Sequence, residues 1–307
     1  MITRPNVKIN LGLNILRKRE DGFHDLETLF VPYFGLCDTL EIITGDDFSK
    51  TSASLFSRYS KDRIPSSQGW TEAEGVFGVE TESSEAPEIV QGISEDGRLM
   101  ITIAREQGVD WDPLNDLTAK AYSLLSADFD LPPVKIFLEK TSPVGAGLGG
   151  GSADAAFALK MLNEMCSLSL TEEHLAGYAA RLGSDCAFFI YNRPMVGEGR
   201  GEILTPYQSD ILSGYDLQVV VPEGIAVSTA DAYRGITPRI PDCPLTDVLT
   251  RPVEEWDGLL VNDFEATVFA KYPSLAAIKR SLYDSGAVYA SMSGSGSALF
   301  ALYKKNL

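Results

Sequence analysis

The sequence predicts an α+β fold. Stretches that alternate apolar and polar residues, as strands do, occur along the 307-residue chain together with stretches whose apolar residues lie three and four apart, as in helices. The two kinds follow each other without the regular strand–helix–strand rhythm of a doubly wound sheet. The hydrophobic content of 44% is enough for the core of one large domain or of two modest domains.

The first half of the chain is predicted to be mostly strands. Residues 7–16 alternate apolar and polar side chains, and the β-branched and aromatic residues of 27–44 favour one or two further strands. Residues 45–98 are rich in Ser, Glu, Gly and Thr, so we expect an insertion of long, partly mobile loops there. The next expected elements are a strand at 98–104, a helix over 112–129 and a strand at 134–143.

The second half is predicted to mix helices and strands. A glycine-rich stretch leads into a helix over 152–166, and a second helix follows with Thr171 as its N-cap and Gly183 as its end. The apolar run 185–191 favours a short strand or another buried segment. The remaining expected elements are a strand at 217–224, helices within 261–286, and strands at 288–294 and 297–304.

Charge and composition exclude several classes of function. The net charge of −17 predicts repulsion from nucleic acid and from anionic membranes. The sequence contains no apolar leader segment and no apolar run near the ~18 residues of a membrane span, so we expect a cytoplasmic protein. Four scattered cysteines (Cys37, Cys166, Cys186 and Cys243) and two histidines favour reduced thiols and no protein-held metal site.

The stretch "PVGAGLGGGSADAA" (residues 143–156) is the strongest chemical signal. It lies between a predicted strand and a predicted helix, where free backbone amides form a site for anionic oxygens. Ser152 is placed to cap the helix and to reach a phosphate or a metal. The stretch lacks the GK[ST] of a Walker A loop, and "GAGLGG" alone is a weak dinucleotide fingerprint. A plain flexible connection and a dinucleotide loop stay open as less favoured alternatives.

The same stretch resembles the central ATP-binding motif of the GHMP kinases. Residues 7–30 resemble the amino-terminal signature of one family among them, the 4-diphosphocytidyl-2-C-methyl-D-erythritol kinases. The segments "LGSDCAFFI", "GEGRGEILTP" and "SMSGSGSALFAL" resemble further motifs in the same order, whereas residues 45–98 match nothing. The resemblance implies a two-lobed fold with a ligand cleft between the lobes. Residues 1–162 would form a lobe of the ribosomal S5 domain 2 type, and residues 163–307 a second, α/β lobe.

The resemblance implies ATP-dependent phosphorylation of the 2-hydroxyl of 4-diphosphocytidyl-2-C-methyl-D-erythritol, a step of non-mevalonate isoprenoid synthesis. Mg²⁺ would arrive with ATP, and the enzyme would be a monomer or a homodimer. One alternative is another small-alcohol GHMP kinase of the homoserine or mevalonate type, which the segment "DGFH" disfavours. Another is a non-catalytic GHMP-fold binding protein, which the presence of both Lys8 and Asp185 disfavours.

Two residues are implied to be catalytic. Asp185 precedes apolar residues that would partly desolvate its carboxylate and make it a better base. Lys8 alternates with Val7 and Ile9 and so points away from their face, and the resemblance places it beside the aspartate and the reacting hydroxyl. Cys186 is interpreted as a packing residue rather than a nucleophile, because no histidine lies near it in the sequence.

The resemblance also implies ligand contacts. Asn10 shares the strand face of Lys8, and Phe23 and His24 would stack on and hydrogen-bond to cytosine. Thr229 and Tyr233 match a second base-contacting segment, with Tyr233 as the opposite stacking face. Asn115 or Asp116 would serve the adenine. The residues implied to hold the ATP phosphates are Pro143, Gly145, Gly147, Leu148, Gly149, Gly150, Gly151, Ser152 and Ala153.

Overall fold

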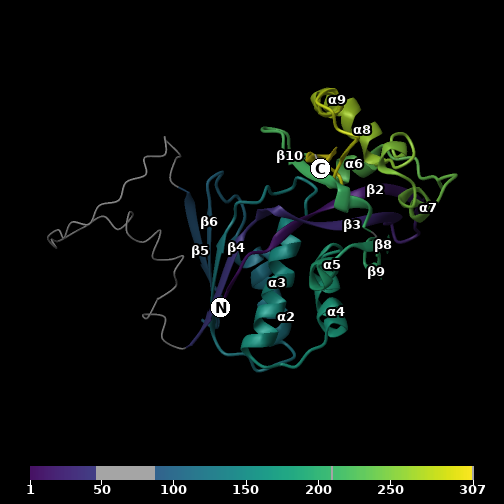
Figure 1. Cartoon of the computed structure of the whole chain (residues 1–307). Coiled ribbons are helices and arrows are strands. Elements are labelled where there is room, and N and C mark those ends of the chain that lie inside the picture. The colour runs from purple at the N-terminus through teal and green to yellow at the C-terminus, as the bar shows by residue number, and fades with distance from the viewer. Residues whose placement is uncertain (46–86, 209, 306–307) are drawn as a thin grey trace.

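The computed structural model describes residues 1–45, 87–208 and 210–305 of the chain. These residues form three β-sheets with helices packed against them, and this confirms the predicted α+β class (Figure 1). Residues 46–86, most of the expected insertion, lie outside the described residues. Within the described part, no helix has both the length and the apolar character needed to cross a membrane.

The first sheet has five strands in the order β1-β4-β7-β6-β5, and only its β6–β7 pair is parallel. Alternate side chains such as Ile42, Ile101 and Ile136 are fully or almost fully buried in one core. The strands are β1 (Ile2–Thr3), β4 (Thr39–Thr44), β5 (Glu88–Ile93), β6 (Leu99–Arg105) and β7 (Val134–Glu139).

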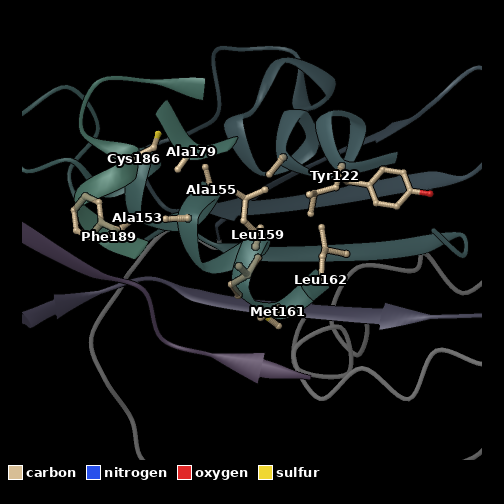
Figure 2. Packing of buried hydrophobic residues seen from close by; sticks show 14 of the residues in the cluster. Tyr122, Ala153, Ala155, Leu159, Met161, Leu162, Ala179, Cys186 and Phe189 are labelled. Carbon is tan, nitrogen blue, oxygen red and sulfur yellow. The ribbon is translucent and has the colours of Figure 1, made fainter. Parts of the chain in front are cut away.

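Four helices complete this first core. On α3 the small side chains of Ala153 and Ala155 and the larger ones of Leu159 and Leu162 are all fully buried in this core (Figure 2). The alanines leave room for neighbouring elements to approach closely. Thr171 caps α4 by accepting from the His174 amide, and Gly183 ends it, as predicted. The helices are α2 (Leu117–Ser126), α3 (Gly150–Met165), α4 (Glu172–Leu182) and α5 (Cys186–Tyr191).

The second sheet is built on the long strand β2, which contributes to two further cores. Val7, Ile9 and Leu11 are buried in one of them, and Leu13 and Ile15 in the other. Between these groups the register with β3 shifts by a bulge at Gly12, whose φ is +65°. The antiparallel order is β2 (Asn6–Lys18), β3 (His24–Cys37), β8 (Met195–Gly199) and β9 (Ile203–Pro206).

The third sheet lies toward the carboxyl end of the chain. Its strands are antiparallel in the order β10-β12-β11, and α8 and α9 pack nearby through Phe264, Val268, Leu275 and Leu282 (Figure 1). The strands are β10 (Tyr215–Val220), β11 (Tyr289–Met292) and β12 (Leu299–Lys304). The α-helices are α6 (Thr229–Arg234), α7 (Leu245–Leu249), α8 (Phe264–Lys271) and α9 (Pro273–Asp284), and 3₁₀ turns lie at 113–115, 211–214 and 253–255.

Several local expectations were wrong. Residues 88–93 form strand β5 instead of a loop of the insertion, because pairing with β6 overrides their weak pattern. Of the two alternatives for residues 185–191, the strand was wrong and the buried segment is confirmed: they contain helix α5, whose residues 186–190 are buried, since a short apolar run carries no usable period. The helix expected over 112–129 is divided at Asp116, which caps α2. Strands β8 and β9 were not predicted.

The start of α3 also differs from the prediction. The helix begins at Gly150, and Gly149, with φ of +72°, occupies the N-cap position. Ser152 therefore lies within the first turn and does not cap the helix. The division into lobes at residue 162 stays a prediction, although α4 and α5 pack in the same core as α2 and α3.

The bulge at Gly12 provides a test of the fold. An added Cβ would lie 2.6 Å from Leu260 Cδ1 and 2.7 Å from Leu245 Cδ1, in a backbone conformation that L-residues avoid. We expect Gly12→Ala to lower the free energy of unfolding by about 2–4 kcal/mol in urea denaturation. The control is Gly177→Ala within α4, where an added Cβ meets nothing within 4 Å. That variant should gain about 0.5–1 kcal/mol. Equal effects of the two substitutions would contradict this account of β2.

Candidate active site

The loop between β7 and α3 packs tightly against two distant segments. Gly147 has φ of +78°, and an added Cβ would lie 2.1 Å from the Ser293 carbonyl oxygen. Gly149 has φ of +72°, and an added Cβ would lie 3.2 Å from Lys8 Cε and 3.1 Å from Phe189. The glycines at these two positions are therefore required by packing within the protein itself.

The first turn of α3 presents free backbone amides. The Ala153 amide is bonded to the Gly149 carbonyl at 2.9 Å, so the amides of Gly150, Gly151 and Ser152 precede the first intrahelical bond. An added Cβ at Gly151 would meet nothing within 4 Å. Unpaired amides at a helix start, next to open space, form a site for anionic oxygens.

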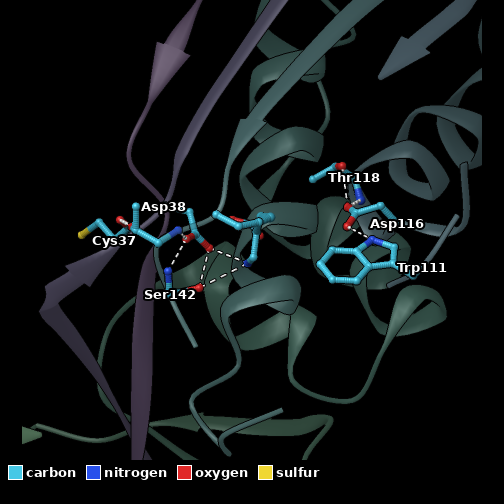
Figure 3. A network of polar contacts seen from close by, with 9 residues as sticks. Cys37, Asp38, Trp111, Asp116, Thr118 and Ser142 are labelled. Atoms are coloured by element: carbon cyan, nitrogen blue, oxygen red, sulfur yellow. Dashed lines mark hydrogen bonds and ion pairs between the residues drawn. The ribbon is translucent and has the colours of Figure 1, made fainter. Parts of the chain in front are cut away.

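A buried cation fixes the base of this loop (Figure 3). Lys140 Nζ donates to Asp38 Oδ2 at 2.5 Å, to Asp154 Oδ2 at 2.7 Å and to Ser142 Oγ at 3.2 Å. All three charged side chains are at most 3% exposed. Burial alone lowers the pKa of Lys140, but the two carboxylates outweigh burial and raise it, so the ammonium stays charged. The cluster ties the end of β7 to the first turns of α3.

Lys8 and Asp185 form an ion pair. Lys8 is 3% exposed, and its Nζ lies 3.2 Å from Asp185 Oδ2. The same Nζ donates to Asn10 Oδ1 at 2.5 Å and to the Gly147 carbonyl at 3.0 Å. Asp185 precedes α5 without capping it and keeps 32% exposure, so its carboxylate is accessible from a cavity. The prediction that Lys8 and Asn10 share one face of the strand is confirmed.

Two cavities meet at the glycine loop. The large cavity, about 600 Å³, is lined by Lys8, Asn10 and Asp185 and extends toward α6. The small cavity, about 380 Å³, lies against the first turn of α3 and is lined on another side by Trp111 and Asn115. Gly145, Gly147 and Gly149 line both. A ligand in each cavity would meet the other at this loop, beside the Lys8–Asp185 pair.

Aromatic residues line the far end of the large cavity. The His24 and Tyr233 rings stack with centroids 4.8 Å apart, so no base fits between these two rings. Burial, and to a lesser degree Lys18, lowers the pKa of His24 below 6.5, which favours a neutral ring at pH 7. Phe23 is 53% exposed, and Thr229 lines the same cavity. The structure thus brings these four residues together, with Tyr233 placed directly on His24.

The other predicted nucleotide residues divide into two groups. The side chains of Leu148 and Ala153 are fully buried in the cores, so only the backbone atoms of these two residues are placed to contact a nucleotide. The second group lines the small cavity: Pro143, Gly145, Gly147, Gly149, Gly150, Gly151 and Ser152.

Asn115 and Asp116 both line the small cavity. Asp116 accepts hydrogen bonds from the Thr118 amide, the Thr118 hydroxyl and Trp111 Nε1 (Figure 3). Because these bonds occupy its carboxylate, Asn115 is the freer of the two candidates for a ligand contact.

Sequence reasoning missed three side chains of the site. Trp111 lines the small cavity, Arg200 lines the large one, and Ser293 Oγ donates to the Gly147 carbonyl at 3.1 Å. Arg200 and Ser293 lie in the segments "GEGRGEILTP" and "SMSGSGSALFAL", which resemble family motifs, but the sequence did not show which side chains of these segments point into the site.

Burial raises the pKa of Cys186 to about 12, so this thiol is protonated near neutral pH and fits a packing role.

Residues 116–193 match the GHMP kinases N terminal domain, and residues 251–306 match the GHMP kinases C terminal domain. A protein of Bacteroides fragilis named 4-diphosphocytidyl-2-C-methyl-D-erythritol kinase is 45% identical over 99% of this chain and 92% of its own length. A protein of the same name from Bacteroides thetaiotaomicron is 42% identical over the same shares of the two chains.

Solved structures agree with these matches. A crystal structure of 4-(cytidine 5'-diphospho)-2C-methyl-D-erythritol kinase superposes with a TM-score of 0.68 at 28% identity, covering 98% of this chain and 90% of its own. Homoserine kinase from Cytophaga hutchinsonii, at 15% identity and a TM-score of 0.59 over 98% of this chain and 86% of its own, shares the fold. The chain belongs to the 4-diphosphocytidyl-2-C-methyl-D-erythritol kinase family of the GHMP kinases.

Proposed function

We propose that this kinase transfers the γ-phosphate of ATP to the 2-hydroxyl of 4-diphosphocytidyl-2-C-methyl-D-erythritol. The observation that carries the proposal is the position of the Lys8–Asp185 pair, 3.2 Å apart, where the two cavities meet at the glycine loop. The names of the relatives identify the alcohol, and the site has the parts that such a transfer requires.

ATP would lie in the small cavity. Its phosphates would accept hydrogen bonds from the amides of Gly150, Gly151 and Ser152, while the base would lie toward Trp111 and Asn115. The described residues include no group of three or more His, Cys, Asp or Glu that could hold a metal. Mg²⁺ would arrive with ATP, bound by the phosphates and by water as is common for this ion, with the Ser152 hydroxyl nearby.

The alcohol would lie in the large cavity with its 2-hydroxyl at Asp185. The carboxylate can accept the hydroxyl proton, and the Lys8 ammonium holds that carboxylate in place and stabilises negative charge on the phosphoryl group in transfer. Phosphoryl transfer depends chiefly on positioning and charge, and a buried cation held by three partners supplies both.

The cytosine would lie at the aromatic end of the large cavity. Phe23 offers an exposed ring for stacking, and the neutral His24 can donate to or accept from the base edge while Tyr233 supports its ring. Thr229 and Asn10 are further polar groups on the cavity wall. We further propose a cytoplasmic enzyme that acts as a monomer or a homodimer.

A coupled ADP-release assay with four alcohols tests the substrate: the cytidylyl substrate, homoserine, mevalonate and galactose. We expect kcat/KM to be highest for the cytidylyl substrate by at least about 10³-fold, because polar groups built to pair with a base are left unpaired by the others. Comparable turnover of homoserine or mevalonate would overturn the substrate assignment while leaving the kinase activity in place.

Asp185→Asn keeps the shape of the side chain and removes its charge and its proton acceptor. We expect kcat to fall by at least about 10²-fold, with KM for ATP largely kept, because the nucleotide lies on the other side of the loop. Steady-state kinetics with an unfolding curve as control check this. Turnover close to that of the unchanged enzyme would exclude Asp185 from the chemistry.

Gly151→Val tests the phosphate site without disturbing the protein packing. The new side chain would enter open space beside the first turn of α3, since an added Cβ meets nothing within 4 Å. The valine side chain should keep a phosphate from reaching the backbone amides of this turn. Losing one hydrogen bond to a charged phosphate is expected to raise KM for ATP at least about tenfold, with an unchanged melting temperature. A folded variant with the original KM for ATP would argue against phosphate binding at this turn.

A further inference from the structure

We propose that Arg200 binds the diphosphate group of the alcohol substrate and so selects a nucleoside diphosphate over a plain nucleoside. This inference rests on the proposed function, because the diphosphate belongs to the proposed substrate. Arg200 lies at the tip of the β8–β9 hairpin and lines the large cavity.

The hairpin places this side chain between the two ends of the cavity. Its guanidinium carbon lies 4.9 Å from the Phe23 ring centroid, at the aromatic end. An added Cβ on the next residue, Gly201, would lie 3.9 Å from Asp185 Oδ1, at the reactive end. A substrate with its base near Phe23 and its hydroxyl at Asp185 would carry its diphosphate past the hairpin tip.

A diphosphate bound in the large cavity would need a positively charged side chain near it. Among the described residues that line the large cavity, Lys8 and Arg200 carry a positive charge. The Lys8 ammonium is buried and engaged by Asp185, Asn10 and Gly147. The protein carries a net charge of −17, which repels an anionic substrate. Arg200 is thus the group left to offset the charge of the diphosphate.

Arg200 is both held in place and partly free. Its amide donates to Glu202 Oε2 at 2.6 Å, and its Nε lies 3.5 Å from Glu202 Oε1. The side chain is 36% exposed, and Asp21 lies within its electrostatic reach. Glu202 pairs with Nε of the guanidinium. The two terminal nitrogens of the guanidinium remain as a planar pair of donors, which suits the oxygens of a diphosphate.

The test compares Arg200→Gln with Arg193→Gln, which removes the same charge from an exposed arginine paired with Glu172. Isothermal titration measures the affinity for cytidine and for CDP, and kinetics measure KM for the cytidylyl alcohol. We expect Arg200→Gln to weaken CDP binding and to raise that KM by about 10- to 100-fold, with cytidine affinity and KM for ATP kept. Arg200→Lys should recover part of the loss, and Arg193→Gln should change nothing.

Two results would overturn the inference. Equal loss of cytidine and CDP affinity would mean that Arg200 acts through the Phe23 ring, and an unchanged preference for CDP would mean that it does not contact the diphosphate. Failure of the unchanged enzyme to turn over the cytidylyl alcohol would instead overturn the proposed function. The binding measurements on Arg200 variants and the activity of the unchanged enzyme therefore test the inference and the proposed function separately.

Discussion

The burial of the Lys8 ammonium is the constraint on which the rest of the site depends. A charge that is 3% exposed is tolerated only when it is paired, because an isolated buried ion is very costly. Its partners come from three segments: Asn10 on β2, Gly147 on the glycine loop and Asp185 ahead of α5. These segments must pack together before the charge is satisfied, so folding itself assembles the proposed catalytic pair.

The glycine loop is shaped by the same requirement. The Gly147 carbonyl accepts from Lys8 and from Ser293, and any side chain on Gly147 would collide with the Ser293 backbone. Below it, the Lys140 cluster holds the end of β7 against α3. The loop is therefore held on both sides before any nucleotide binds. A preformed phosphate site avoids the ordering cost that a flexible glycine linker would add on binding.

Local pattern in the sequence was sufficient for strand β2 and for the two ends of helix α4. The two-residue period of β2 placed Lys8 and Asn10 on one face, and the capping residues of α4 were readable from Thr171 and Gly183. Features set by distant contacts were not readable. Helix α5 follows from packing on α3 and α4, β5 from pairing with β6, and the His24–Tyr233 stack from two segments far apart in the chain. The role of Asp185 came from family resemblance, because its residue type and neighbours alone favoured an ordinary aspartate at a helix terminus or turn.

A double-mutant cycle on the single-turnover rate of phosphoryl transfer tests the central claim, that Lys8 and Asp185 act as one unit. Lys8→Met, Asp185→Asn and the double variant would be compared in single-turnover reactions with saturating ATP, after their folding is checked. If the two groups act together, the double variant should lose little more rate than the worse single variant. Additive losses in the logarithm of the rate would contradict the claim and would mean that the two groups contribute to the rate independently.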